Sequence, residues 1–222
     1  ENEADETKKG RVVIAGAGCG AYDLITVRAL NAVKAAEVLV YDDLIDEHLL
    51  EFAPESCELI YAGKRSGRHS KAQEEINELL VEKALEGRYV VRLKGGDPYV
   101  FGRGGEEALA LKAHGIPVHE VPGVTSGIGL CGMAGIPVTH RGASRGFHVI
   151  TGHTRRDVKP DIDYEALVKL NATLIFLMGV SAMETILTEL IKAGMPEDMP
   201  AAVIERGTTA RQRQVCATVK TL

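Results

Sequence analysis

The sequence predicts an α/β protein built from two lobes. Apolar, β-rich runs alternate along the chain with amphipathic stretches, and glycine turns follow several of the runs. Some runs are apolar throughout, as is typical of parallel strands that are buried on both faces. A chain of 222 residues is long enough for one large domain or two small ones.

The apolar runs and the helical stretches between them can be placed along the chain. A capping box of Ser70 and Gln73 predicts the start of one helix, and Gly87 its end. A second amphipathic stretch ends in the same way at Gly194. The predicted strands cover residues 11–15, 37–41, 57–62, 89–93, 118–121, 147–151, 173–178, 201–205 and 214–219.

Residues 122–146 differ from the rest because they are rich in glycine and small side chains. This composition favours a hinge and a small-residue helix between two lobes. We therefore expect a tail at residues 1–9, an N-terminal α/β lobe at 10–122 and a C-terminal α/β lobe at 123–222. The last predicted strand has no closing helix, so we expect the natural chain to continue beyond residue 222.

Charge and cysteine content exclude several classes of protein. The formal net charge of −5 argues against a general nucleic-acid binder, although one basic pocket for an anionic small molecule stays open. The four cysteines are far apart and the histidines lack metal-ligand spacing, so we expect no metal site and a reducing, cytoplasmic location. No apolar run is long enough to span a bilayer.

A glycine turn follows the first predicted strand. Gly16, Gly18 and Ala21 fit the dinucleotide-binding pattern, and Asp42 and Asp43 follow about twenty residues later, where a ribose-binding acid would stand. One reading is therefore an NAD-dependent oxidoreductase. The pattern alone is weak, because other cofactors use the same strand–turn–helix entrance.

The segment "RLKGGDPYVFGRGGEE", residues 92–107, is the strongest candidate for a functional loop. It follows a buried strand directly, and α/β folds bind ligands at the carboxyl ends of their strands. Gly95 and Gly96 allow the backbone to approach a ligand closely, while Arg103 projects from a glycine-rich backbone. Glu106 and Glu107 open a helix, where the helix dipole favours acids. The alternative is a flexible surface loop.

Two further clusters are ambiguous by themselves. Positive charge gathers at residues 64–71, which suits a polyanionic substrate but equally suits a solvated turn. The hydroxyls of Thr125 and Ser126 either cap a helix or bind a ligand.

Several segments together make the chain resemble the tetrapyrrole methylase family from about Gly10 to Arg213. They are "GAGCGAYDLIT", "VLVYDDLI", "AGKRSGRHSKAQEEIN", "VVRLKGGDPYVFGRGGEE", "VPGVTSGIGLCGMAGIPVTHR", "FLMG" and "AAVIERGTTARQRQV". The resemblance implies a two-lobed fold with a mainly parallel N-terminal sheet and a mixed C-terminal sheet. It also implies an S-adenosyl-L-methionine-dependent C-methyltransferase that methylates uroporphyrinogen III twice, giving precorrin-2 for sirohaem or cobalamin synthesis.

The resemblance also assigns a cofactor site in the cleft between the lobes. The residues that it places there are Cys19, Gly95, Gly96, Asp97, Val100, Thr125, Ser126, Met178, Ala202 and Gly207. The chain departs from the family pattern at Cys19, which replaces a proline, and at Ala21 and Tyr22, which replace Asp-Pro. We expect these changes to affect cofactor affinity or the substrate entrance, not the reaction class.

Catalytic and substrate-binding roles follow from the resemblance in the same way. Asp42 corresponds to a proposed proton acceptor and Lys64 to a proposed donor, with Glu106 a further candidate. The guanidinium of Arg103 keeps its proton under all ordinary conditions, which makes it a better carboxylate anchor or charge stabiliser than a base. The expected substrate anchors are Arg65, Arg68, His69 and Arg141.

The resemblance further implies a homodimer, and a fusion to another enzyme of the pathway is an open expectation. Three alternatives remain at this stage: the NAD-dependent oxidoreductase, a tetrapyrrole-binding module that has lost turnover, and a different corrin-pathway methyltransferase.

Overall fold

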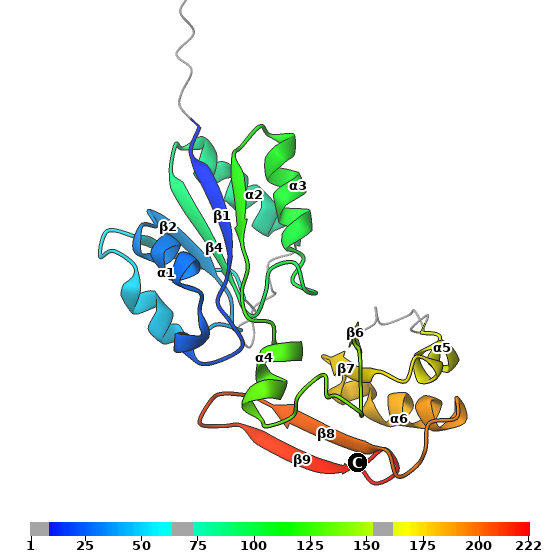
Figure 1. The fold of residues 1–222 in the computed structure, drawn as a ribbon. Helices are drawn as coiled ribbons and strands as arrows, with labels where there is room; N and C mark the ends of the chain where they lie inside the picture. Colours follow the sequence, from blue (N-terminus) through cyan, green and yellow to red (C-terminus); the bar gives the residue numbers. More distant parts are fainter. Residues whose placement is uncertain (1–8, 64–72, 153–161) are drawn as a thin grey trace, which may run out of the picture. The chain divides into compact units, whose positions relative to one another are not determined.

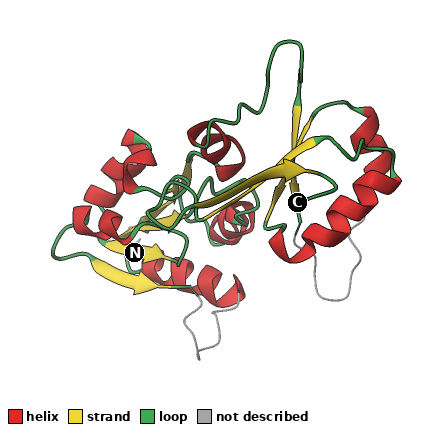
Figure 2. Ribbon diagram, turned by 90° about the horizontal axis from the view of Figure 1, so that it is seen from below, coloured by secondary structure: helices red, strands yellow, loops and turns green. Residues whose placement is uncertain are grey.

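A computed structural model describes residues 9–63, 73–152 and 162–222. The chain divides into two compact units, Glu1–Thr125 and Ser126–Leu222 (Figure 1). Each unit combines helices with strands, which confirms the predicted α/β class (Figure 2). None of the described helices has the length and apolar character needed to cross a membrane.

The first unit is a five-stranded parallel sheet in the order β3-β2-β4-β1-β5. Each of its strands matches a run that the sequence predicts to within one residue at either end. The strands are β1 (Arg11–Gly16), β2 (Val38–Tyr41), β3 (Glu58–Tyr61), β4 (Tyr89–Lys94) and β5 (Val118–Val121). The helices are the short η1 (Tyr22–Leu24), α1 (Val27–Lys34), η2 (Glu47–Phe52), α2 (Gln73–Leu85) and α3 (Gly104–Ala113).

Both faces of this sheet are covered at its central strands, which explains why runs such as residues 12–15 and 38–40 are apolar throughout. Alternate strand residues, such as Val12 and Ile14, pack under α2 and α3 on one face. Their neighbours Val13 and Ala15 pack under α1 and η2 on the other face. The sheet is therefore the middle layer of three, and its carboxyl-terminal edge is the part that remains open to loops.

Capping residues and glycines explain where the helices begin and end. The hydroxyl of Thr26 accepts a hydrogen bond from the Ala29 amide at 3.2 Å and caps α1. Gly87 follows α2 with a left-handed φ of 82°, and Gly194 follows α6 in the same way at 96°, as the sequence predicts. The predicted capping residue Ser70 lies outside the described residues.

The second unit begins with α4 (Ser126–Met133), the expected small-residue helix. A Cβ atom on Gly127 would lie only 3.2 Å from the Val149 side chain, so glycine allows α4 to approach β6 closely. The other elements are β6 (Phe147–Thr151), α5 (Tyr164–Lys169), β7 (Thr173–Leu177), η3 (Val180–Ala182), α6 (Met183–Lys192), β8 (Pro200–Glu205) and β9 (Arg213–Thr218).

Both strand directions occur in the second unit, as expected for a mixed arrangement. Strands β6 and β7 pair in parallel, whereas β8 and β9 form an antiparallel pair. In the described part of the chain the two directions are divided between two separate pairs.

Candidate functional site

Three glycines bring three loops of the first unit into backbone contact. A Cβ atom on Gly16 would lie 2.5 Å from the carbonyl oxygen of Gly96, and one on Gly123 would lie 2.1 Å from the same oxygen. Gly96 also pairs with Gly18, donating to its carbonyl at 2.7 Å and accepting from its amide at 3.3 Å. The turn after β1, the loop after β4 and the segment after β5 therefore meet at one point.

The predicted residues Cys19 and Thr125 lie beside this junction. Cys19 is buried and directly follows Gly18. Among the residues that the structure describes, a Cβ atom on Gly96 would meet only Thr125, at 4.0 Å, so one side of Gly96 is open to them. Its φ of 67° is left-handed, which favours glycine, and its amide and carbonyl are both bonded to Gly18 on the opposite side. This arrangement can accept a small ligand against bare backbone.

Asp97 braces the loop from within. One carboxylate oxygen accepts a hydrogen bond from the Tyr99 amide at 2.8 Å, and the other accepts from the Gly123 amide at 3.1 Å. Further along, the Val100 amide donates to the Asp97 carbonyl at 3.2 Å. The loop is thus built by specific bonds, which argues against the flexible-loop alternative.

Arg103 stands at the start of α3 in a strained conformation. Its φ of 58° is left-handed, as is that of Phe101 at 53°, and strain of this kind concentrates at functional sites. The guanidinium donates to both carboxylate oxygens of Glu106, at 2.9 and 2.5 Å, with about half of each side chain exposed. The hydrogen bond to Glu106 raises the pKa of Arg103, so this residue is a permanent cation.

Asp42, at the carboxyl end of β2, belongs to a charged cluster that the sequence interpretation missed. It accepts a hydrogen bond from Arg92 at 3.0 Å and one from the Leu44 amide at 3.1 Å. Arg92, Lys94 and Glu107 are all buried. The sequence predicts only a helix-start role for Glu107, yet this residue has no exposed surface. The available signal was a pair of cations in an otherwise apolar strand, because buried charges require partners.

The pKa of Lys94 is lowered in this cluster. Burial is the main cause, and the charge of Arg92 adds to it, while the contact with Glu107 opposes both. The ammonium of Lys94 lies 3.0 Å from Glu107.

The strand order contradicts the dinucleotide reading of the first glycine turn. In the dinucleotide-binding fold the first two strands are neighbours, so the acid after the second lies beside the glycine turn. Here β4 lies between β1 and β2. Asp42 is therefore displaced from the glycine turn by an additional strand, about 5 Å wide.

The predicted residues of the second unit lie on separate elements. Met178 follows β7 with a left-handed φ of 56° and is exposed. Ala202 lies on β8 opposite Cys216, and Gly207 follows the same strand, packed so closely on α4 that a Cβ atom would lie 1.8 Å from Leu130. Arg141 is exposed in the segment between α4 and β6.

Lys64, Arg65, Arg68 and His69 lie outside the described residues. Just before them, the hydroxyl of Tyr61 donates a hydrogen bond to Asp43.

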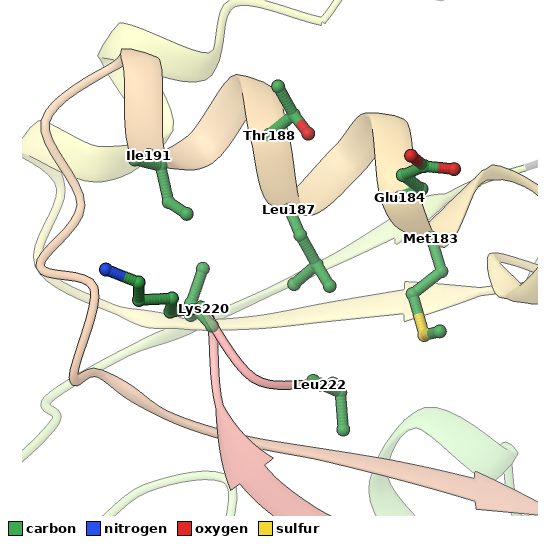
Figure 3. Close-up of a pocket in the computed structure, with 8 residues that line it drawn as sticks. Met183, Glu184, Leu187, Thr188, Ile191, Lys220 and Leu222 are labelled. Atoms are coloured by element: carbon green, nitrogen blue, oxygen red, sulfur yellow. The ribbon is translucent and has the colours of Figure 1, made fainter.

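The second unit has a hollow of its own. It lies between α6 and the last described residues, with Met183, Leu187 and Ile191 facing Lys220 and Leu222 (Figure 3). Its lining has none of the predicted site residues. Across residues 9–63, 73–152 and 162–222, no group of three or more potential metal ligands gathers.

The fold and the junction define an α/β protein whose loops meet at the carboxyl ends of its parallel strands, where α/β folds bind small ligands. The family model "Tetrapyrrole (Corrin/Porphyrin) Methylases" matches residues 11–222. The chain belongs to this family, which confirms the resemblance seen in the sequence.

Individual relatives agree with this membership. A uroporphyrinogen-III C-methyltransferase of Methanocaldococcus jannaschii is 52% identical over 213 residues, which are 95% of this chain and 87% of the relative. A sirohaem synthase of Nitrosospira multiformis is 44% identical over the whole chain, which spans 47% of that longer protein. The crystal structure of the uroporphyrin-III C-methyl transferase from Thermus thermophilus complexed with S-adenyl homocysteine has a TM-score of 0.81 and 41% identity, covering 95% of this chain and 84% of the other.

Proposed function

We propose that this chain is an S-adenosyl-L-methionine-dependent C-methyltransferase that acts on uroporphyrinogen III. The observation that carries the proposal is the 52% identity to a methyltransferase of that specificity, over almost the whole of both chains. The glycine junction adds a physical reason, because it presents open backbone at the edge where a small ligand binds in α/β folds.

The residues of the first unit fit such a cofactor. Gly96 has room on one side, and the loop around it is held rigid by Asp97. Gly95 supports the same loop, since a Cβ atom there would lie 2.5 Å from the Leu44 side chain. We assign the cofactor contacts of this unit to Cys19, Gly95, Gly96, Asp97, Val100 and Thr125. The roles of Ser126, Met178, Ala202 and Gly207 stay predictions.

The cofactor supplies a methyl group on a positively charged sulfur, and the chain must align it with a carbon of the substrate ring. Alignment of two reactants contributes several kcal/mol to catalysis. The ring system loses a proton as it gains the methyl group, so a base is useful. Asp42 is our candidate, and Lys64 and Glu106 are the other candidates for moving protons.

The substrate carries acid side arms that need cationic partners. Arg103 is exposed to about half and suits a carboxylate, because guanidinium groups bind carboxylates through two parallel hydrogen bonds. Glu106 occupies both of these donors in the described structure, so we expect a substrate carboxylate to displace it or share the guanidinium. We assign the remaining anchoring to Arg65, Arg68, His69 and Arg141.

We further propose the product, the oligomeric state and the location of the enzyme. It adds two methyl groups to one ring system, which yields precorrin-2. It acts as a homodimer. We place it in the cytoplasm, where the four cysteines, none of which forms a disulfide, suit reducing conditions. Sedimentation equilibrium tests the homodimer.

Anaerobic incubation with uroporphyrinogen III and S-adenosyl-L-methionine, followed by mass spectrometry, tests the activity. We expect products with one and then two added methyl groups, and none when S-adenosylhomocysteine replaces the donor. Thermal shifts with S-adenosylhomocysteine and with NADH provide a second test, in which only the first should stabilise the protein. A protein that binds S-adenosylhomocysteine yet methylates nothing would contradict the proposal and favour a binding module.

A further inference from the structure

The buried carboxylate of Glu107 is the centre of the charged cluster in the first unit. One of its oxygens accepts hydrogen bonds from Arg92 at 3.3 Å, Lys94 at 3.0 Å and Gln73 at 3.2 Å. Its other oxygen is buried without a hydrogen-bond partner in the described part of the chain. Burying a carboxylate costs free energy unless it is paired with opposite charges, here those of Arg92 and Lys94.

Arg92 transmits this constraint to the proposed base. Its Nε atom donates to Glu107, and one terminal nitrogen donates to the carbonyls of Val40 and Leu93 at 3.4 and 3.1 Å. The other terminal nitrogen donates to Asp42 at 3.0 Å. All three nitrogens of a planar, rigid group are thus engaged, so the position of Glu107 determines the plane in which Arg92 meets Asp42.

Asp42 in turn has few other constraints. Its second oxygen accepts from the Leu44 amide at 3.1 Å, and its side chain retains 19% of its exposure. The carboxylate is therefore oriented from the buried side by Arg92 and remains accessible from the other. The cluster balances two cations, Arg92 and Lys94, against Asp42 and Glu107, so removing one charge leaves the others uncompensated.

We propose that Glu107 is a positioning residue, which orients the carboxylate of Asp42 through the guanidinium of Arg92. This inference rests on the proposed methyl transfer with Asp42 as the base. Glu107 itself is buried and does not touch the substrate, so it acts only through its neighbours.

The competing role for Glu107 is to hold the cofactor loop. Lys94 is the last residue of β4, its carbonyl accepts from the Ala17 amide at 2.7 Å, and Gly95 follows it. If Glu107 served this loop, its removal would weaken cofactor binding. If it orients Asp42, its removal lowers turnover and leaves cofactor binding intact.

The first experiment compares Glu107→Gln with the wild type. We expect kcat to fall roughly ten- to a hundred-fold, as misplaced catalytic groups do. The KM for uroporphyrinogen III and the calorimetric Kd for S-adenosylhomocysteine should stay within about twofold. Glu75→Gln, an exposed change on α2, is the matched control and should keep full activity. A loss of S-adenosylhomocysteine affinity in Glu107→Gln would overturn the inference in favour of the loop role.

The second experiment repeats Glu107→Gln in an Asp42→Asn background. Because the effect passes through Asp42, we expect the second change to lower the residual rate by less than about twofold. If Glu107→Gln lowers kcat by the same factor in the Asp42→Asn background as in the wild type, the inference is overturned. Arg92→Lys keeps the charge but loses the planar contact, so it should reproduce the loss of kcat and its dependence on Asp42, even if Glu107→Gln does not fold. A wild-type protein that methylates no uroporphyrinogen III would overturn the proposed function itself, and this inference with it.

Discussion

The two units of this protein differ in how they bury their strands. Most side chains of the central strands β1, β2 and β4 in the first unit are buried, because helices cover both faces of the sheet. In the second unit the strands are half-buried or exposed, and its buried apolar side chains among the described residues are Ile186, Leu190 and Val219. The first unit therefore has a core of its own, which can hold charged groups at its edge in defined positions.

Both units nevertheless place left-handed residues after their strands. Phe101 and Arg103 follow β4 in the first unit, while Met178 and Arg206 follow β7 and β8 in the second. Backbone of this kind costs about 1–3 kcal/mol per residue and persists only where the surroundings enforce it. The difference is that the first unit adds a buried charged cluster, so we assign the proton chemistry to it.

The largest effect should come from removing Asp42 or Arg103. Asp42→Ala and Arg103→Ala should each lower kcat by roughly 10²- to 10⁴-fold, the usual range for loss of a proton-transferring or charge-stabilising group. Both variants should keep their affinity for S-adenosylhomocysteine, since neither side chain supplies the glycine junction. Methylation assays beside isothermal titration test this. Full activity in both variants would show that neither residue takes part in the mechanism. The assignment of the proton chemistry to the first unit would then be wrong.

A matched pair of leucines measures the difference in packing. Leu39→Ala in the first unit should destabilise the protein by about 2–5 kcal/mol, because Leu39 is fully buried between β2 and its covering helices. Leu170→Ala in the second unit should cost less than about 1 kcal/mol, because this side chain is 54% exposed. Urea unfolding followed by circular dichroism compares them. Equal losses would show that the second unit is packed as tightly as the first.

A matched pair of glycines gives a smaller contrast. In Gly123→Ala the new methyl group meets backbone atoms of Gly96 and Gly16, which cannot move away without breaking the junction. In Gly207→Ala it meets the side chain of Leu130, which can change its rotamer. We expect losses of about 3 kcal/mol and about 1 kcal/mol respectively. Scanning calorimetry of both variants measures the losses, and a larger loss in Gly207→Ala would reverse the comparison.

Much of the fold was accessible from local patterns. The apolar runs, the stops at Gly87 and Gly194 and the small-residue helix after residue 125 are all where the sequence predicts them. These signals depend only on residues that are neighbours along the chain, so they can be recognised without any knowledge of the tertiary structure. The family was accessible for the same reason, since its motifs are short contiguous segments.

Only the tertiary structure shows which strands lie side by side and which charged residues meet. The position of β4 between β1 and β2 separates Asp42 from the glycine turn, and it brings Arg92 against both Asp42 and Glu107. Glu107 looks like an ordinary acid at a helix start until α3 is packed against the sheet. Sequence periodicity determines which face of an element is apolar, but strand order and the meeting of distant charges depend on the packing of the whole unit.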